Sequence, residues 1–170
     1  TKQAKHAQSA FQIEDAINSL DREITNYLVD ISSKSISPIE SNRHMLLMDS
    51  IRDIERIGDH FENIIELTDI QVLNRLSLTD EALEDLTIKT VDNAVQALNL
   101  NDKELAREAA EQEDLIDKME RKYRKRHILR LNDGTCSAQA GIVFVDIISN
   151  LERIGDHAVN IAEAVLGNRV

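Results

Sequence analysis

Turn-forming and aromatic residues are scarce in this 170-residue chain, which has one proline, five glycines and 3% aromatic residues. Little material is left for tight turns or for the aromatic pairs typical of β-sheets. The chain favours Leu, Ala, Glu, Lys and Arg, all good helix formers. The composition predicts an all-α protein of long antiparallel helices, with enough residues to bury a core as one domain or two small ones.

Cysteine and long apolar runs are also scarce. The single Cys136 excludes an internal disulfide and a metal site of several cysteines, and it favours a reducing compartment. We expect its thiol to be buried as a small apolar group. The longest uncharged apolar run, around Ala138–Val145, is too short for a membrane span. Without such a span, we expect the chain as given to be soluble. The polar segment Thr1–Ser9 has no signal-peptide core, and the missing Met indicates a chain that was processed or cut from something longer.

Positive charge is in deficit, because 31 acidic residues face 20 lysines and arginines and give a net charge of −11. This balance argues against a general nucleic-acid binder. It is compatible with a cation-binding protein and equally with a protein that is only well solvated.

Apolar residues at helical spacing predict five helices. Ser37 is placed to cap the second helix before Pro38, and Thr79 to cap the third after a loop near Asn74–Leu78. Gly167 is placed to close the fifth helix. The expected helices run over about Lys2–Ser32, Pro38–Asp69, Thr79–Leu100, Asn101–Leu131 and Cys136–Leu166.

The chain contains an internal repeat, which constrains the architecture. Residues 55–66 and 152–163 are identical at nine of twelve positions, at an offset of 97. An offset of 99 aligns the first predicted helix with the fourth, pairing Ile17 with Ile116 and Leu20 with Met119. The repeat unit is therefore three helices, and the first unit, residues 1–72, lacks the leading helix that the second, residues 73–170, possesses. We expect the first unit to expose an apolar face.

Each copy of the repeat carries Glu-x-x-x-Asp, which places two carboxylates on one face of a helix, one turn apart. Glu55 and Asp59 form the first pair and Glu152 and Asp156 the second. The preceding helix of the second unit adds Glu113 and Asp117, and that of the first adds Glu14 with Asn18. Two such faces brought together would offer four carboxylates to a hard or borderline cation such as Mg, Mn, Fe or Ca. A solvated acidic face is the competing interpretation.

Other repeated residues are interpreted structurally. Gly58 and Gly155 each cost a helix about 1 kcal/mol relative to Ala, which close approach of a neighbouring helix, or of a ligand between helices, would justify; we expect the packing role. His60 and His157 lie around the helix from the acidic pairs, and we expect them to be structural rather than ligands.

The repeated Glu-Arg-Ile-Gly-Asp-His-x-x-Asn-Ile, with Glu-x-x-x-Asp on another helix, resembles the phosphate-uptake regulator family PhoU. The resemblance covers nearly the whole chain and implies two three-helix-bundle repeats that carry multinuclear metal clusters. Residues 22–29 and 127–136 look more specifically like the PhoU-like cytoplasmic tail of bacterial sodium/phosphate cotransporter-related membrane proteins. A free-standing regulator is the alternative.

What the resemblance implies is carried over position by position. The metals to expect are Fe, Mg, Mn or Zn, and Asn18 departs from the family pattern, so the first site should bind more weakly or not at all. The expected partner is a membrane transporter or the chain's own transmembrane domain, at the inner face of the cell membrane. Nucleic acid is not an expected partner. The resemblance leaves undecided whether the chain forms a homodimer. The implied metal ligands are Glu113, Asp117, Glu152 and Asp156 in the second unit and Glu14, Glu55 and Asp59 in the first.

A basic run interrupts this acidic chain and has two interpretations. It complements the dipole at the end of a long helix, or it docks onto anionic lipid or the cytoplasmic face of a transporter. Its cations are Arg121, Lys122, Arg124, Lys125 and Arg126.

Three function classes follow. The preferred one is a regulatory, metal-binding module that modulates phosphate transport, without catalysis, because no nucleophile–base pair or Gly-rich phosphate loop is apparent. A ferritin-like di-metal oxidase would use Glu-x-x-His, which does not occur in the chain. The third class is an interaction module whose acidic face binds no ligand.

Overall fold

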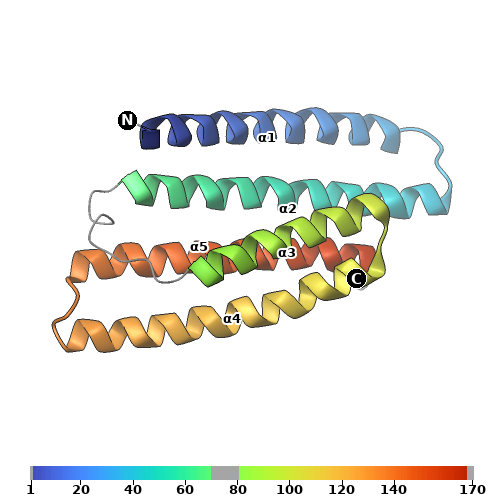
Figure 1. Ribbon diagram of the computed structural model, residues 1–170. Helices are drawn as coiled ribbons and strands as arrows, with labels where there is room; N and C mark the ends of the chain where they lie inside the picture. The colour runs from blue at the N-terminus through green and yellow to red at the C-terminus, as the bar shows by residue number, and fades with distance from the viewer. Residues whose placement is uncertain (1, 70–80, 168–170) are drawn as a thin grey trace.

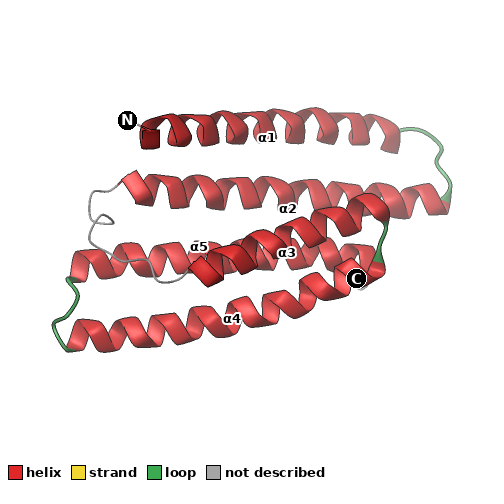
Figure 2. Cartoon of the chain, in the orientation of Figure 1, coloured by secondary structure: helices red, strands yellow, loops and turns green. Residues whose placement is uncertain are grey.

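A computed structural model describes residues 2–69 and 81–167 of the chain. Within these ranges every element is a helix, joined by short loops (Figure 2). The elements are α1 (Lys2–Ser32), α2 (Pro38–Asp69), α3 (Glu81–Leu100), α4 (Lys103–Asn132) and α5 (Ala138–Leu166). The predicted all-α class is therefore confirmed. The expected loop near Asn74–Leu78, the cap at Thr79 and the boundary between residues 72 and 73 lie outside the described residues.

Local signals fix the helix ends. The Ser37 backbone N–H donates to the Glu40 carboxylate at 2.7 Å, and the Glu40 N–H donates to the Ser37 hydroxyl at 3.3 Å. This reciprocal capping box confirms the predicted start of α2. Gly167 closes α5 in the left-handed conformation, with φ 77°, as predicted.

The start of α5 corrects the prediction at Cys136. Ser137 caps the helix by accepting the Ala140 N–H, so α5 begins at Ala138, two residues later than expected. Cys136 is half-buried in the preceding loop rather than buried, because it lies outside the helix and its thiol contacts the Ser137 carbonyl.

Helix α5 is the centre of the packing, with α3 and α4 on one side and the pair α1 and α2 attached through α2 (Figure 1). The three helices α3, α4 and α5 pack against one another, α2 packs against α5, and α1 packs against α2 alone among the described helices. Small residues bring α3 close, since Ala94 and Ala97 are fully buried against α5 residues such as Ala158 and Ala162. The second unit thus has the most complete core.

Reciprocal polar contacts join the two repeats at the α2–α5 interface. The rings of His60 and His157 stack with centroids 5.6 Å apart. His60 Nδ1 lies 2.9 Å from the Asn150 side-chain oxygen, and His157 Nδ1 lies 2.9 Å from a carboxylate oxygen of Asp53. The offset of 97 pairs His60 with His157 and Asp53 with Asn150. The same contact is made in both directions, so the two repeats face each other through an approximate two-fold axis at the stacked rings, and both histidines have structural roles.

The first unit exposes an apolar face, as expected. Ile13 and Leu20 of α1 are 60% and 55% exposed. Their counterparts in the second unit, Gln112 and Met119, lie beside α3: Gln112 accepts a hydrogen bond from Asn93, and Met119 packs against the cluster that contains Leu83.

Candidate metal centre

Glycine sets the distance between the two helices that carry the acidic motifs. A Cβ atom on Gly155 of α5 would lie 3.1 Å from Ile116 Cδ1 and 3.8 Å from Glu113 Cγ, both on α4. The equivalent Gly58 of α2 faces Ile17 of α1 at 3.4 Å. The expectation that both glycines serve close helix packing is therefore confirmed, and in the second unit the glycine brings Glu113 close to α5.

Three of the predicted ligands come together at this approach. Glu113, Asp117 and Asp156 each offer a carboxylate oxygen, and these oxygens all lie within 4.8 Å of one another. Glu113 and Asp117 are half-buried, and Asp156 is exposed at the rim. Glu152, one helical turn before Asp156, is half-buried and lies close enough to raise the pKa of Glu113.

Burial and mutual repulsion both disfavour the charged form of these carboxylates. Loss of water, followed by the charges of Asp117 and Asp156, raises the pKa of Glu113 to about 7. Loss of water and the charges of Asp156 and Asp117 raise the pKa of Glu152, and loss of water and the charge of Asp117 raise that of Asp156. The cluster therefore holds excess negative charge that a cation would neutralise.

Positive side chains compensate part of this charge. Arg121 contacts the Asp117 carboxylate at 2.8 Å, one turn further along α4. Burial and the neighbouring carboxylates raise the pKa values of Asp156 and Glu152, and the positive charge of Arg153 offsets part of this rise. Both arginines are exposed, so water screens them and the compensation is incomplete.

The predicted ligands of the first unit form no comparable group. Within the described residues, Glu14, Glu55 and Asp59 do not join in a three-carboxylate cluster. The Asn18 amide donates a hydrogen bond to the Glu14 carboxylate, and Arg56 lies 3.7 Å from Glu55 and 3.8 Å from Asp59. Asn18 thus supplies a donor where the second unit has the acid Asp117. That the second site binds metal better than the first stays a prediction.

Two acidic residues beside the motifs were missed from the sequence. Glu120 is buried on α4. Loss of water is the main cause of the raised pKa of Glu152, and the charge of Glu120 raises this pKa further. Asp21 is its counterpart at an offset of 99. Loss of water is the main cause of the raised pKa of Glu55, and the charge of Asp21 raises this pKa further. Both follow the first acid of their motif by seven residues, which is two helical turns. That spacing was visible in the sequence and could have found them.

The basic run is divided by its partners. Arg124 pairs with Glu120 and donates to the Ser149 hydroxyl at 2.8 Å, and Arg121 pairs with Asp117. Lys122, Lys125 and Arg126 are exposed. Only Arg130 lies in the last turn of α4, because the helix continues to Asn132. The helix dipole acts over the last turn and therefore does not account for the run, so this interpretation was wrong.

Comparison with known proteins agrees with the fold and the repeat. The model of the PhoU domain matches residues 1–68 and 81–165. The chain belongs to the PhoU family. A PhoU protein of Thermotoga maritima, "phosphate-specific transport system accessory protein PhoU homolog 1", is 32% identical over 94% of this chain and 71% of its own length. The PhoU homolog of Xylella fastidiosa strain 9a5c is 26% identical over 90% of this chain and 66% of its own length.

Solved PhoU structures share the fold. The crystal structure of PhoU from Pseudomonas aeruginosa superposes with a TM-score of 0.88 at 25% identity, over 94% of this chain and 79% of that one. "Phosphate transport system regulatory protein PhoU" from Streptococcus pneumoniae gives a TM-score of 0.83 at 24% identity, over 97% of this chain and 80% of that one, which concerns the fold alone. The relatives from Thermotoga maritima and Xylella fastidiosa are named as accessory proteins and the Streptococcus pneumoniae protein as a regulatory protein of phosphate transport, and none of these names is that of a cotransporter.

Proposed function

We propose that this chain is a regulatory accessory module of phosphate transport whose second unit binds a cation. Membership of the PhoU family and the descriptions of its relatives support the first part. They favour a free-standing accessory protein, the alternative in the sequence analysis, over the cotransporter tail that was its main interpretation. In the described residues no helix has the length and apolar character to cross a membrane.

The observation that carries the cation site is the meeting of three carboxylates within 4.8 Å between α4 and α5. An all-oxygen donor set suits Mg, Mn, Fe or Ca. It suits Zn less, because zinc prefers nitrogen and sulfur ligands. Glu113, Asp117 and Asp156 would hold the ion, and Glu152 would complete the negative shell. The donor set fits a hard cation.

The bound ion would supply positive charge and cross-link α4 to α5. It would replace Arg121 as the counter-charge of Asp117, and it would stabilise the ionised form of Glu113 at neutral pH. The residues provide no separate catalytic machinery in this proposal. The function is therefore regulatory: occupancy of the centre reports on ionic conditions and stabilises the face formed by the second unit.

A titration with Mn²⁺ by isothermal calorimetry tests the cation site. We expect at least one equivalent to bind the chelator-stripped protein, and Asp156→Asn or Asp117→Asn to weaken binding at least tenfold. The matched control is Asp59→Asn, which occupies the position of Asp156 in the first unit and should leave this binding step unchanged. Absence of binding, or equal weakening by Asp59→Asn, would favour the interaction module without a ligand.

The transport role needs a cellular test. We expect the chain to restore regulated phosphate uptake in bacteria that lack their own PhoU, measured as uptake of radioactive phosphate. Asp156→Asn should impair the restoration while Asp59→Asn retains it. If the wild-type chain is present in the cells at normal abundance and phosphate uptake is unchanged, the regulatory role is contradicted. Equal restoration by wild type and Asp156→Asn would separate that role from the cation.

A further inference from the structure

The C-terminal half of α4 presents a basic face that the cation centre and the helix packing do not use. We infer that this face docks onto an anionic lipid surface. We define the α4 basic face as Lys118, Lys122, Lys125, Arg126 and Leu129, all exposed. This inference concerns a different surface from the cation site and does not depend on its occupancy.

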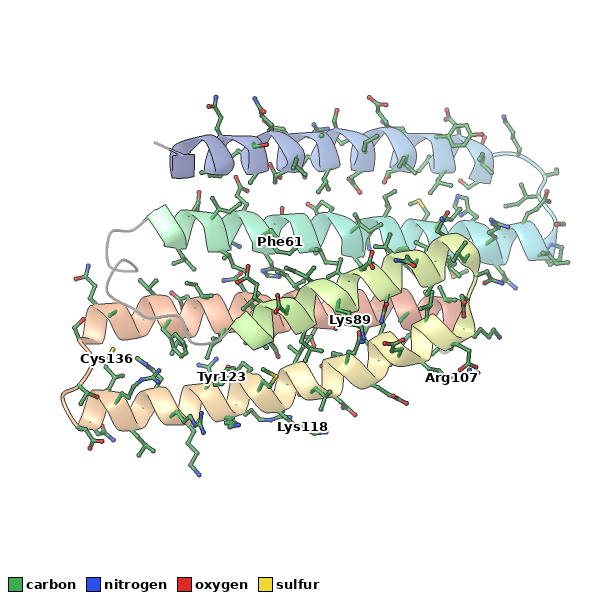
Figure 3. The ribbon with its side chains drawn as sticks, in the orientation of Figure 1. Phe61, Lys89, Arg107, Lys118, Tyr123 and Cys136 are labelled. Atoms are coloured by element: carbon green, nitrogen blue, oxygen red, sulfur yellow. The ribbon has the colours of Figure 1, made fainter. Side chains whose placement is uncertain are left out.

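Helix geometry places these residues on the outward side of α4. The buried residues of this half are Ile116, Glu120 and His127. Lys118, Lys122, Lys125 and Leu129 recur at intervals of four, three and four residues, which makes one stripe along the helix. Each of the first two follows a buried residue by two positions, about 200° around the helix, and so points to the opposite side. Figure 3 shows Lys118 on the side of α4 that is turned away from the other helices.

The face carries positive charge that none of the ion pairs in the described part of the chain neutralises. Between Lys118 and Asn132 the only acidic residue is Glu120, which is buried and paired with Arg124. In the described part of the chain, no ion pair engages Lys118, Lys122, Lys125 or Arg126. Asp114, one turn before Lys118, is the exposed acid nearest to this stripe along the helix, and from Lys122 to Arg126 no exposed acid interrupts the cations, which make a local field opposite in sign to the net charge of −11.

Charge is segregated along the same helix. Its N-terminal half exposes more acids than cations: Lys103 and Arg107 stand against Glu104, Glu108, Glu111 and Asp114. An α4 lying on an anionic surface would therefore be attracted by its C-terminal half and repelled by its N-terminal half. This polarity orients the molecule on the surface, with the end at the α4–α5 turn held closest.

Apolar side chains at that end favour lipid over an acidic protein. Leu129 lies within the basic stripe and is 54% exposed, and Ile128 beside it is 50% exposed. Ile142, near the start of α5, is 63% exposed. Exposed apolar residues among lysines and arginines on a rigid helix are typical of segments that lie in the membrane interface. The charges draw the face to the headgroups, and Leu129 is placed to enter the boundary region.

Sedimentation with vesicles tests this inference. The purified chain, with chelator present to exclude metal bridges, is mixed with phosphatidylcholine vesicles with or without phosphatidylglycerol. We expect binding to the anionic vesicles only, and its loss at about 1 M salt, where the screening length falls to about 3 Å. Binding to both vesicle types alike, or to neither, would overturn the inference; absence of binding would point to an acidic protein surface instead.

Matched variants locate the surface. Each cation close to an anionic membrane contributes about a fivefold gain in affinity, so changing Lys118, Lys122, Lys125 and Arg126 to Gln should weaken binding at least a hundredfold. Leu129→Gln should weaken it about threefold to tenfold. The control changes Arg22, Lys34, Arg52 and Lys103, exposed cations on other parts of the chain, to Gln. This control variant has the same net charge as the variant of the α4 basic face. An equal loss of vesicle binding in the two variants would refute the proposed location.

Discussion

Replacing Glu113 by Gln should stabilise the metal-free protein at neutral pH, and the size of the gain follows from what burial and the neighbouring carboxylates cost the Glu113 charge. Loss of water and the neighbouring carboxylates raise the pKa of Glu113 from 4.5 to about 7. The full difference corresponds to about 3 kcal/mol of unfolding free energy. Glu113 is only half-buried, so solvent screens its neighbours and we expect about 1 kcal/mol.

The sign depends on pH in a defined way. A carboxyl with a higher pKa in the folded chain than in the unfolded chain holds its proton more tightly when folded. Glu113 therefore favours folding below pH 4.5, and this contribution is lost as the pH rises through about 7. The amide introduced by Glu113→Gln carries no charge at any pH. The variant should match wild type near pH 4 and exceed its stability near pH 8.

Urea unfolding followed by circular dichroism, with chelator at both pH values, measures the difference. Glu111→Gln is the control, because Glu111 is exposed on the same helix and outside the cluster, and its effect should stay within about 0.5 kcal/mol. A Glu113→Gln variant no more stable than wild type near pH 8 would show that burial and the neighbouring carboxylates do not penalise the Glu113 charge as described.

Two further predictions concern the packing that holds the centre. Gly155→Ala should lower the unfolding free energy by about 1 kcal/mol, because a Cβ 3.1 Å from Ile116 outweighs the gain in helix propensity. Gly58→Ala, with its nearest contact at 3.4 Å, should raise it by about 0.5 kcal/mol, and effects of the same sign in thermal unfolding would contradict this comparison. Asp53→Ala should cost about 2 kcal/mol in urea unfolding, since it removes the buried partner of His157 at the junction of the repeats; a cost below about 0.5 kcal/mol would show that the junction contributes little.

Much of the fold was predictable because its signals are local. Pro38 with Ser37 sets the start of α2, and Gly167 sets the end of α5, each within a few residues in the sequence. The repeated motif also identified α4 and α5 as carriers of the acidic pairs. Gly155 indicated a close neighbour for α5, and the structure shows that this neighbour is α4, where three of the four predicted ligands of the second unit meet.

The remaining features depend on contacts between distant residues. The bond between His157 and Asp53 joins positions 104 residues apart, and no spacing pattern in either helix predicts it. The partition of the basic run into paired and unpaired cations required the positions of Glu120 and Asp117 relative to the arginines. The relation of the chain to a cotransporter rested on short segments, and the comparisons over most of the chain favour the accessory proteins instead.

The most direct test of the account is an anomalous diffraction map of crystals grown with Mn²⁺ after removal of other metals. The account predicts a manganese peak between α4 and α5, with carboxylate oxygens of Glu113, Asp117 and Asp156 at coordination distance. A crystal of the same protein with no peak among these oxygens, at a Mn²⁺ concentration that saturates the calorimetric titration, would contradict it.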